Sequence, residues 1–220
     1  MKFSQMVYER PDMEQIKAQL TDLVARLEAA ESYEAAKAVF LEEDQLERHV
    51  ETAFSLAHVR HTIDTRDEFY DGEMNFINEA EPVLTEYMQK WTDALLKSPF
   101  RADFEAEYGS LLFVNAEMAQ KTFSPEIIPM LQEENELKTT YEKLLASAQI
   151  PFEDGVYTLS QMTPFKSDAD DARRLAAWKA EGQWYKDNQE ALDSIYDKLV
   201  HVRDAMGKKL GYAGYTELGY

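Results

Sequence analysis

Residues that end helices are rare in this sequence, and their rarity limits the folds that the chain can adopt. The 220 residues include 8 glycines and 7 prolines, whereas average usage would supply roughly 26 of the two together. In the stretches between these breaks, apolar residues recur at intervals of three and four, the spacing of one face of an α-helix. The chain is therefore expected to fold mainly into long helices.

The N-terminal third carries clear starting signals for two helices. Asp12, with Gln15 three positions later, predicts a helix that runs to about Ala30. Ser32 then provides a side-chain cap for a second helix, whose apolar stripe continues to the polar turn at Asp64.

A third helix is expected directly after that turn. Thr65 and Glu68 form a capping box, and the apolar stripe that follows them ends before Pro99. Pro82 lies inside this stretch, so a kink or a restart is expected there. Two shorter helices should follow, at about 103–108 and 110–121.

The second half of the chain predicts two further long helices. Ser124-Pro125 combines a hydroxyl cap with a proline in the first turn, which indicates a helix that reaches Ala146. Ser167, with Asp170 three positions later, predicts the start of a long final helix that Gly211 ends.

Between these two helices the apolar spacing changes from helical to alternating. An Asp-Gly turn at Asp154-Gly155 separates two alternating runs, which predicts a β-hairpin at about 150–159. An isolated hairpin is only marginally stable in water, so its apolar side chains should pack on the helices. These side chains are Ile150, Phe152, Val156 and Tyr157.

Together the elements predict a mainly α fold, a multi-helix array of long helices with one small β-hairpin. A length of 220 residues suits one large or two small folding units. If the chain divides, the boundary is expected near 122–124. It would separate a helical lobe, 1–122, from a helix, hairpin and long helix at 123–220.

Charge excludes several classes of function. The chain has 23 Lys and Arg against 42 Asp and Glu, a formal net charge of -19. Nucleic-acid binding needs a basic surface, and an anionic membrane would repel this chain, so neither is an expected partner. The longest apolar runs, such as Leu111–Val114, are far too short to span a bilayer. With no cysteine, disulfide and thiol chemistry are excluded, and a cytoplasmic location is permitted.

The four histidines and the acidic clusters are the candidates for chemistry. His58, His61 and Asp64 recur every three residues, which superficially resembles a metal site. Each step of three turns about 60° around a helix, so the outer pair would diverge by about 120°, and the favoured interpretation is two histidines near a helix end. The acidic clusters 42–47 and 133–136 are interpreted as solvated helix faces. His49 and His201 belong to no cluster, so no catalytic, cofactor-binding or metal-binding residue is assigned.

The segment Arg60–Tyr70 resembles the corresponding segment of oligoendopeptidase F and the related thimet-type zinc oligopeptidases. The resemblance begins at Phe3-Ser4 and extends over almost the whole chain. Further matching segments follow in the same order: Ser98–Phe100, Ser124–Ile128, Gln132–Asn135, Leu144–Ala148, Leu199–Arg203, Leu210–Tyr212 and Glu217–Tyr220.

The resemblance implies a cytoplasmic zinc endopeptidase that cuts short peptides in a channel between two mostly helical halves. In that family a His-Glu-x-x-His helix and a downstream Glu hold the zinc, and none of these residues has a counterpart here. The chain is therefore expected to be an N-terminal region, inactive alone, whose partners are the downstream catalytic region and short peptide substrates.

A second hypothesis is a stand-alone acidic helical module that binds a basic partner. The two hypotheses differ in whether the reading frame continues past Tyr220 into a His-Glu-x-x-His motif.

Overall fold

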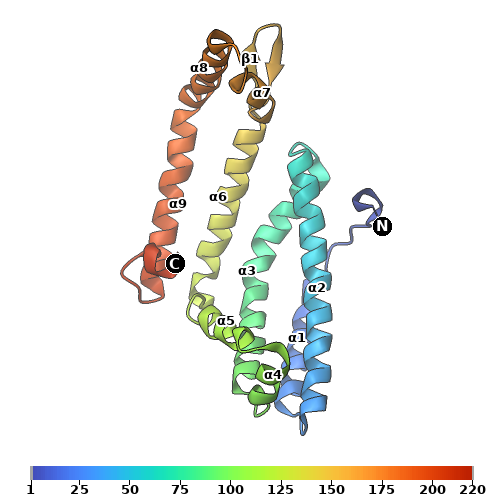
Figure 1. The fold of residues 1–220 in the computed structure, drawn as a ribbon. Coiled ribbons are helices and arrows are strands. Elements are labelled where there is room, and N and C mark those ends of the chain that lie inside the picture. Colours follow the sequence, from blue (N-terminus) through green and yellow to red (C-terminus); the bar gives the residue numbers. More distant parts are fainter. Residues whose placement is uncertain (1, 220) are drawn as a thin grey trace. The chain divides into compact units, whose positions relative to one another are not determined.

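A computed structural model describes residues 2–219 and shows a mainly α fold with one small hairpin (Figure 1). The long helices are α1 (Met13–Glu28), α2 (Tyr33–Ile63), α3 (Glu68–Lys97), α6 (Ile128–Ala146), α8 (Asp171–Asp187) and α9 (Gln189–Lys209). The shorter elements are α4 (Arg101–Tyr108), α5 (Leu111–Ala119), β1 (Ile150–Phe152), β2 (Gly155–Tyr157), α7 (Thr163–Lys166), α10 (Tyr215–Gly219) and three 3-10 turns, Phe3–Gln5, Pro125–Ile127 and Ser160–Met162. The predicted fold class is confirmed.

The described chain separates into two compact units. The first unit contains the residues up to Gln132 and those from Met206 onward, and the second contains Glu133–Ala205. The limits fall within α6 and α9. The boundary expected near 122–124 stays a prediction. No helix among residues 2–219 is long and apolar enough to cross a membrane.

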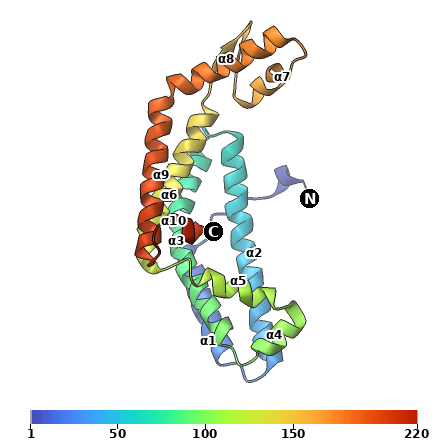
Figure 2. The same cartoon turned by 60° about the vertical axis from the view of Figure 1, so that its left-hand side comes forward.

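In the first unit, α1, α2 and α3 lie side by side and pack on one another (Figures 1 and 2). The predicted caps are confirmed at two helices. The Asp12 carboxylate accepts hydrogen bonds from the backbone N–H groups of Glu14 and Gln15, and the Ser32 hydroxyl accepts one from Ala35. The largest core cluster joins the three helices to α4 and α5, where Phe104 and Phe113 are fully buried.

The start of α3 differs from the prediction. Asp67, not Thr65, is the N-cap residue, and its carboxylate accepts hydrogen bonds from the backbone N–H groups of Phe69 and Tyr70. Glu68 is consequently the first helical residue and cannot be the third residue of a capping box. The helix continues through Pro82 without a restart.

In the second unit, the hairpin pairs Ile150 with Tyr157 and Phe152 with Gly155. The turn therefore consists of Glu153 and Asp154, one residue earlier than predicted, and Glu153 adopts the positive φ of 49°. Ile150 and Phe152 are buried against the helices and Tyr157 packs beside them, as expected, but Val156 is exposed.

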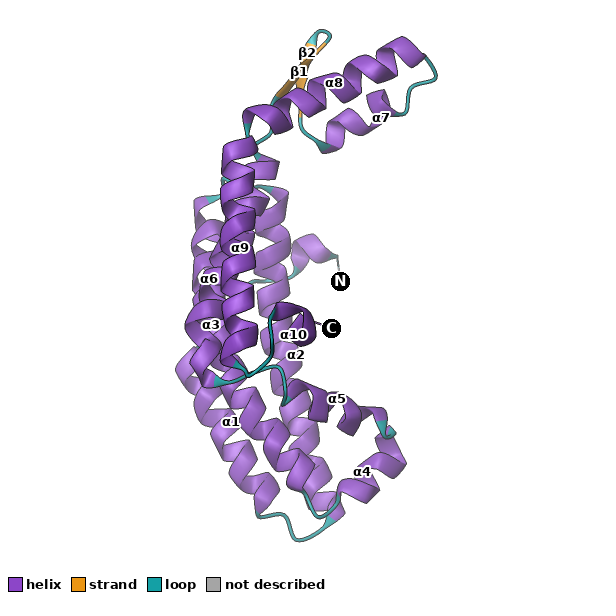
Figure 3. Ribbon diagram, turned by 90° about the vertical axis from the view of Figure 1, so that its left-hand side faces the viewer, coloured by secondary structure: helices purple, strands orange, loops and turns teal. Residues whose placement is uncertain are grey.

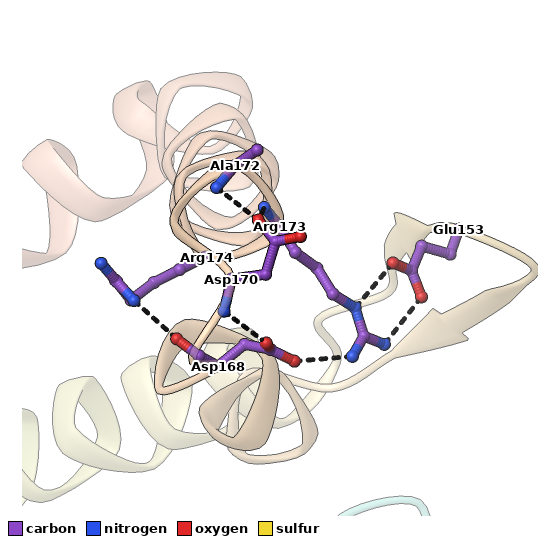
Figure 4. Close-up of polar contacts among 6 residues, drawn as sticks. All are labelled: Glu153, Asp168, Asp170, Ala172, Arg173 and Arg174. Atoms are coloured by element: carbon purple, nitrogen blue, oxygen red, sulfur yellow. Dashed lines mark hydrogen bonds and ion pairs between the residues drawn. The ribbon is translucent and has the colours of Figure 1, made fainter.

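A polar network holds this turn to the start of α8 (Figure 4). The guanidinium of Arg173 donates two hydrogen bonds to Glu153, at 2.8 and 2.9 Å, and one to Asp168, at 2.7 Å. Hydrogen bonds from Arg173 lower the pKa of Glu153. The backbone N–H of Asp170 and the Arg173 guanidinium lower the pKa of Asp168. These ion pairs therefore join the turn that contains the positive φ of Glu153 to the start of α8.

The long final helix is in fact two helices. Asp170 is the N-cap of α8 instead of Ser167, and Asn188 interrupts the helical backbone at φ -105° and ψ 9°. α9 then continues to Lys209, and Gly211 follows it with a φ of 89°, which confirms the predicted termination. Figure 3 shows that helices make up most of the described chain and that the hairpin supplies the strands.

Candidate functional site

The N-terminal segment, the end of α2 and the start of α3 meet in the first unit and form a connected polar site. Glu73, on α3, is 3% exposed. The Arg10 guanidinium donates hydrogen bonds to both Glu73 carboxylate oxygens, at 2.6 and 2.9 Å, and the Tyr8 hydroxyl donates another. These contacts fix the segment before α1 onto α3.

The electrostatics of this group follow from the pairing. The hydrogen bond from Arg10 is the main reason that the pKa of Glu73 lies below its usual range. Burial and the hydrogen bond to Glu73 raise the pKa of Tyr8. Glu73 is therefore an ionised, bidentate partner of Arg10 and holds the segment before α1 in position.

A second cation, Arg60 at the end of α2, organises the outer part of the site. Its guanidinium donates hydrogen bonds to the Tyr70 hydroxyl, at 2.7 Å, and to the Met6 carbonyl, at 2.5 Å. The same group lies 5.7 Å from the ring centre of Phe3 and 5.6 Å from that of Tyr70. Arg60 thus connects the N-terminal segment to both helices through hydrogen bonds and cation–π contacts.

The three residues that superficially resembled a metal site differ in their surroundings. His61 is fully buried, with its Nε2 3.3 Å from Asp71 Oδ1, whereas His58 is exposed. Asp64 pairs with Arg66 at 3.0 Å, and hydrogen bonds from Arg66 lower its pKa. The two imidazoles therefore lie in different environments. His201, on α9, is also exposed, and its Nδ1 lies 2.7 Å from the Asp197 carbonyl.

The acidic clusters are not uniformly solvated, which corrects the sequence interpretation. Glu43 is 3% exposed and Glu134 is 6% exposed. Arg203 and Lys138 pair with Glu134 at 2.8 and 3.1 Å, so it forms an ion pair between α6 and α9. The Oε1 atom of Glu43 has no hydrogen-bond partner within residues 2–219, and burial is the main cause that raises its pKa to about 8.

Metal-binding geometry was a further feature that the sequence left open. Across residues 2–219, no three His, Cys, Asp or Glu side chains are placed to hold a metal ion. The buried carboxylates of Glu73 and Glu134 are each paired with cationic side chains. The contacts of Arg10 and Arg60 therefore join the N-terminal segment to α2 and α3.

Sequence reasoning missed Glu73 and Glu43, although each leaves a signal. Glu73 lies four residues after Phe69 and three before Phe76, and Glu43 lies between Val39 and Leu46 at the same spacings. A carboxylate on the apolar stripe of a predicted helix indicates a buried, specifically paired or protonated group.

Comparison with known proteins identifies the family. Residues 3–123 match the family model of the Peptidase M3 N-terminal domain. This chain belongs to the M3 peptidase family. No match was found among curated proteins.

Three solved structures resemble this M3 chain over its whole length. A structure described as an oligoendopeptidase F is 43% identical, with a TM-score of 0.97. PZ peptidase A, solved with an inhibitor, is 40% identical with a TM-score of 0.96, and so is a structure described as an oligoendopeptidase F from Bacillus anthracis. All of this chain is covered in each comparison, but only 39–40% of the other chain. The M3 chain thus spans about two fifths of these relatives.

Proposed function

We propose that this chain is the N-terminal region of a zinc endopeptidase that hydrolyses short peptides, and that it forms one wall of the substrate channel. One observation carries the proposal. The chain matches solved oligoendopeptidases over 100% of its own length but fills only 39–40% of theirs. A catalytic region from the rest of such a protein would complete the enzyme.

The residues of this chain do not fit the zinc ion that the family implies. The buried His61 and the exposed His58 cannot bind one ion together, and no other suitable group exists among residues 2–219. The zinc ligands are therefore assigned to the downstream region, and this chain contributes binding and exclusion of folded proteins. The protein is assigned to the cytoplasm. Within the chain, we place the boundary between two helical parts, 1–122 and 123–220, near residues 122–124.

Two measurements test the proposal. The reading frame should continue past Tyr220 into a His-Glu-x-x-His motif. The complete protein should cleave short flexible peptides, and chelation of zinc should abolish this activity. The 220-residue chain should cleave none of them.

A stop codon directly after Tyr220 would reject the peptidase proposal. It would favour the alternative, an acidic helical module that binds a basic partner, for which the net charge of -19 is the supporting observation.

A further inference from the structure

Helix α5 exposes apolar side chains that its sequence predicts to be covered. Its nine residues, Leu-Leu-Phe-Val-Asn-Ala-Glu-Met-Ala, are apolar on nearly every side, a composition typical of a helix that is buried all round. In the structure Phe113 is fully buried, but Leu111, Val114 and Met118 are 66%, 46% and 55% exposed. Their spacing of three and four places them in one row, here named the α5 stripe.

The α5 stripe lies on a firmly held helix. The Arg101 guanidinium lies 4.7 Å from the ring centre of Phe113 and pairs with Glu117 at 2.9 Å. At the C-terminal end of α5, Gln89 on α3 donates a hydrogen bond to the Ala119 carbonyl, and Gln120 donates one to the Gln89 carbonyl. These contacts fix α5 to α3 and α4 and direct the stripe away from them.

The last described part of the chain lies beside α5. The Tyr212 hydroxyl donates a 2.8 Å hydrogen bond to the Lys121 carbonyl, two residues after α5 ends. The backbone of Gly214 lies very close to Gly207, since a Cβ atom on Gly207 would be 2.4 Å from the Gly214 oxygen. This close approach holds the turn between α9 and α10 in place. Figure 3 shows α10 and α5 on the same side of the α1–α3 bundle.

We propose that the polypeptide downstream of residue 220 covers the α5 stripe and that this contact anchors the catalytic region to the N-terminal region. The inference rests on the proposed function. Relatives of this chain are about two and a half times as long, because it fills 39–40% of them. In this chain, Tyr212, near the end of the described residues, contacts Lys121, just after α5.

The chemistry of the stripe favours a permanent contact over a transient peptide. A bound peptide needs partners for its backbone groups, whereas the middle of a helix offers none, because its own backbone groups are paired. Leucine, valine and methionine side chains instead suit the apolar centre of a stable interface.

Oxidation of Met118 by dilute hydrogen peroxide tests the proposal, with mass spectrometry as the readout. Met118 should oxidise rapidly in the 220-residue chain and at least tenfold more slowly in the complete protein. Met206, which is 1% exposed, should react slowly in both samples and so verifies that the first unit is folded.

Other outcomes overturn the proposal. Equal rates in the two proteins would show that nothing downstream covers the stripe. Protection of the 220-residue chain that grows with its concentration would assign the stripe to a second copy. Protection of the complete protein only after peptide is added would assign it to substrate. Peptidase activity with an unprotected Met118 would reject this inference alone, whereas protection without activity would reject the proposed function alone.

A variant pair provides an independent check in the complete protein. Val114→Ser should lower the urea midpoint of unfolding and weaken Met118 protection at least threefold. Val156→Ser is the matched control, because Val156 is 60% exposed on the hairpin and belongs to no such row. Equal effects of the two substitutions would contradict the proposal.

Discussion

Three glutamates illustrate how one side chain acquires different properties inside a helical protein. Glu73 is buried beside Arg10, and Glu134 is buried beside Arg203, so each negative charge has a cationic partner. Glu43 is buried equally well, but the acids Glu47 and Asp44 act on it and add to the effect of burial on its pKa. The folded state therefore favours the charged form of Glu73 and the neutral form of Glu43.

This difference predicts the pH dependence of stability at Glu43. Its pKa is raised from 4.5 to about 8, so its contribution to stability is fully present below about pH 4.5 and is lost as the pH rises through 8. Over this window the free energy of unfolding should fall by about 1.4 kcal/mol per pH unit because of this group.

Glu43→Gln cannot ionise and should therefore gain stability relative to wild type as the pH rises, by roughly 2–3 kcal/mol between pH 5.5 and 7.5. Urea unfolding at the two pH values measures this change. Glu133→Gln, at an exposed position in the other acidic cluster, is the control. If the difference between Glu43→Gln and wild type is the same at both pH values, the buried carboxyl is ionised throughout.

At the scale of elements, a helix start was predicted correctly where the sequence offers one capping residue. Where two capping residues compete, the sequence did not show which one the structure uses. Asp12 and Ser32 each stand alone before an apolar stripe, and both cap their helices as predicted. Before α3, Thr65 and Asp67 both offer a capping oxygen, and the structure uses Asp67, whose backbone is extended at φ -69° and ψ 107°. In the hairpin, the ion pair to Arg173 accompanies the positive φ of Glu153, a contact between residues 20 positions apart that no local rule contains.

The choice between the two candidate caps can be measured. Asp67→Ala removes the acceptor for two backbone N–H groups and should lower the free energy of unfolding by about 1 kcal/mol. Thr65→Ala should cost less than half as much, because its hydroxyl caps no helix. Chemical denaturation of both variants provides the comparison, and a larger effect of Thr65→Ala would restore the capping box that the sequence predicted.

At the scale of the whole molecule, the sequence predicted the family and the fold class, but the site needed the tertiary structure. Tyr8 and Glu73 are 65 residues apart, and Arg60 and Met6 are 54 apart, so their contacts have no local pattern. The three-residue spacing of His58, His61 and Asp64 was local, and the structure adds that His61 is buried whereas His58 is exposed. Spacing thus argued against a shared metal site, whereas it could not show which residues join the N-terminal segment to the helices.

If the zinc ligands lie in the downstream region, histidine substitutions in this chain should have little effect on kcat. His58 and His201 are exposed and far apart in the sequence, so the double variant His58→Ala/His201→Ala should keep kcat within about twofold of wild type on short peptides. His61→Ala leaves a cavity beside Asp71 because the imidazole is fully buried, so it should lower the melting temperature, while the folded fraction keeps its kcat. Removal of zinc should abolish turnover in all variants.

Steady-state kinetics on peptides of increasing length, normalised to the folded fraction by circular dichroism, measures these effects. A folded histidine variant that loses turnover by several orders of magnitude would show that these 220 residues contribute directly to the chemistry.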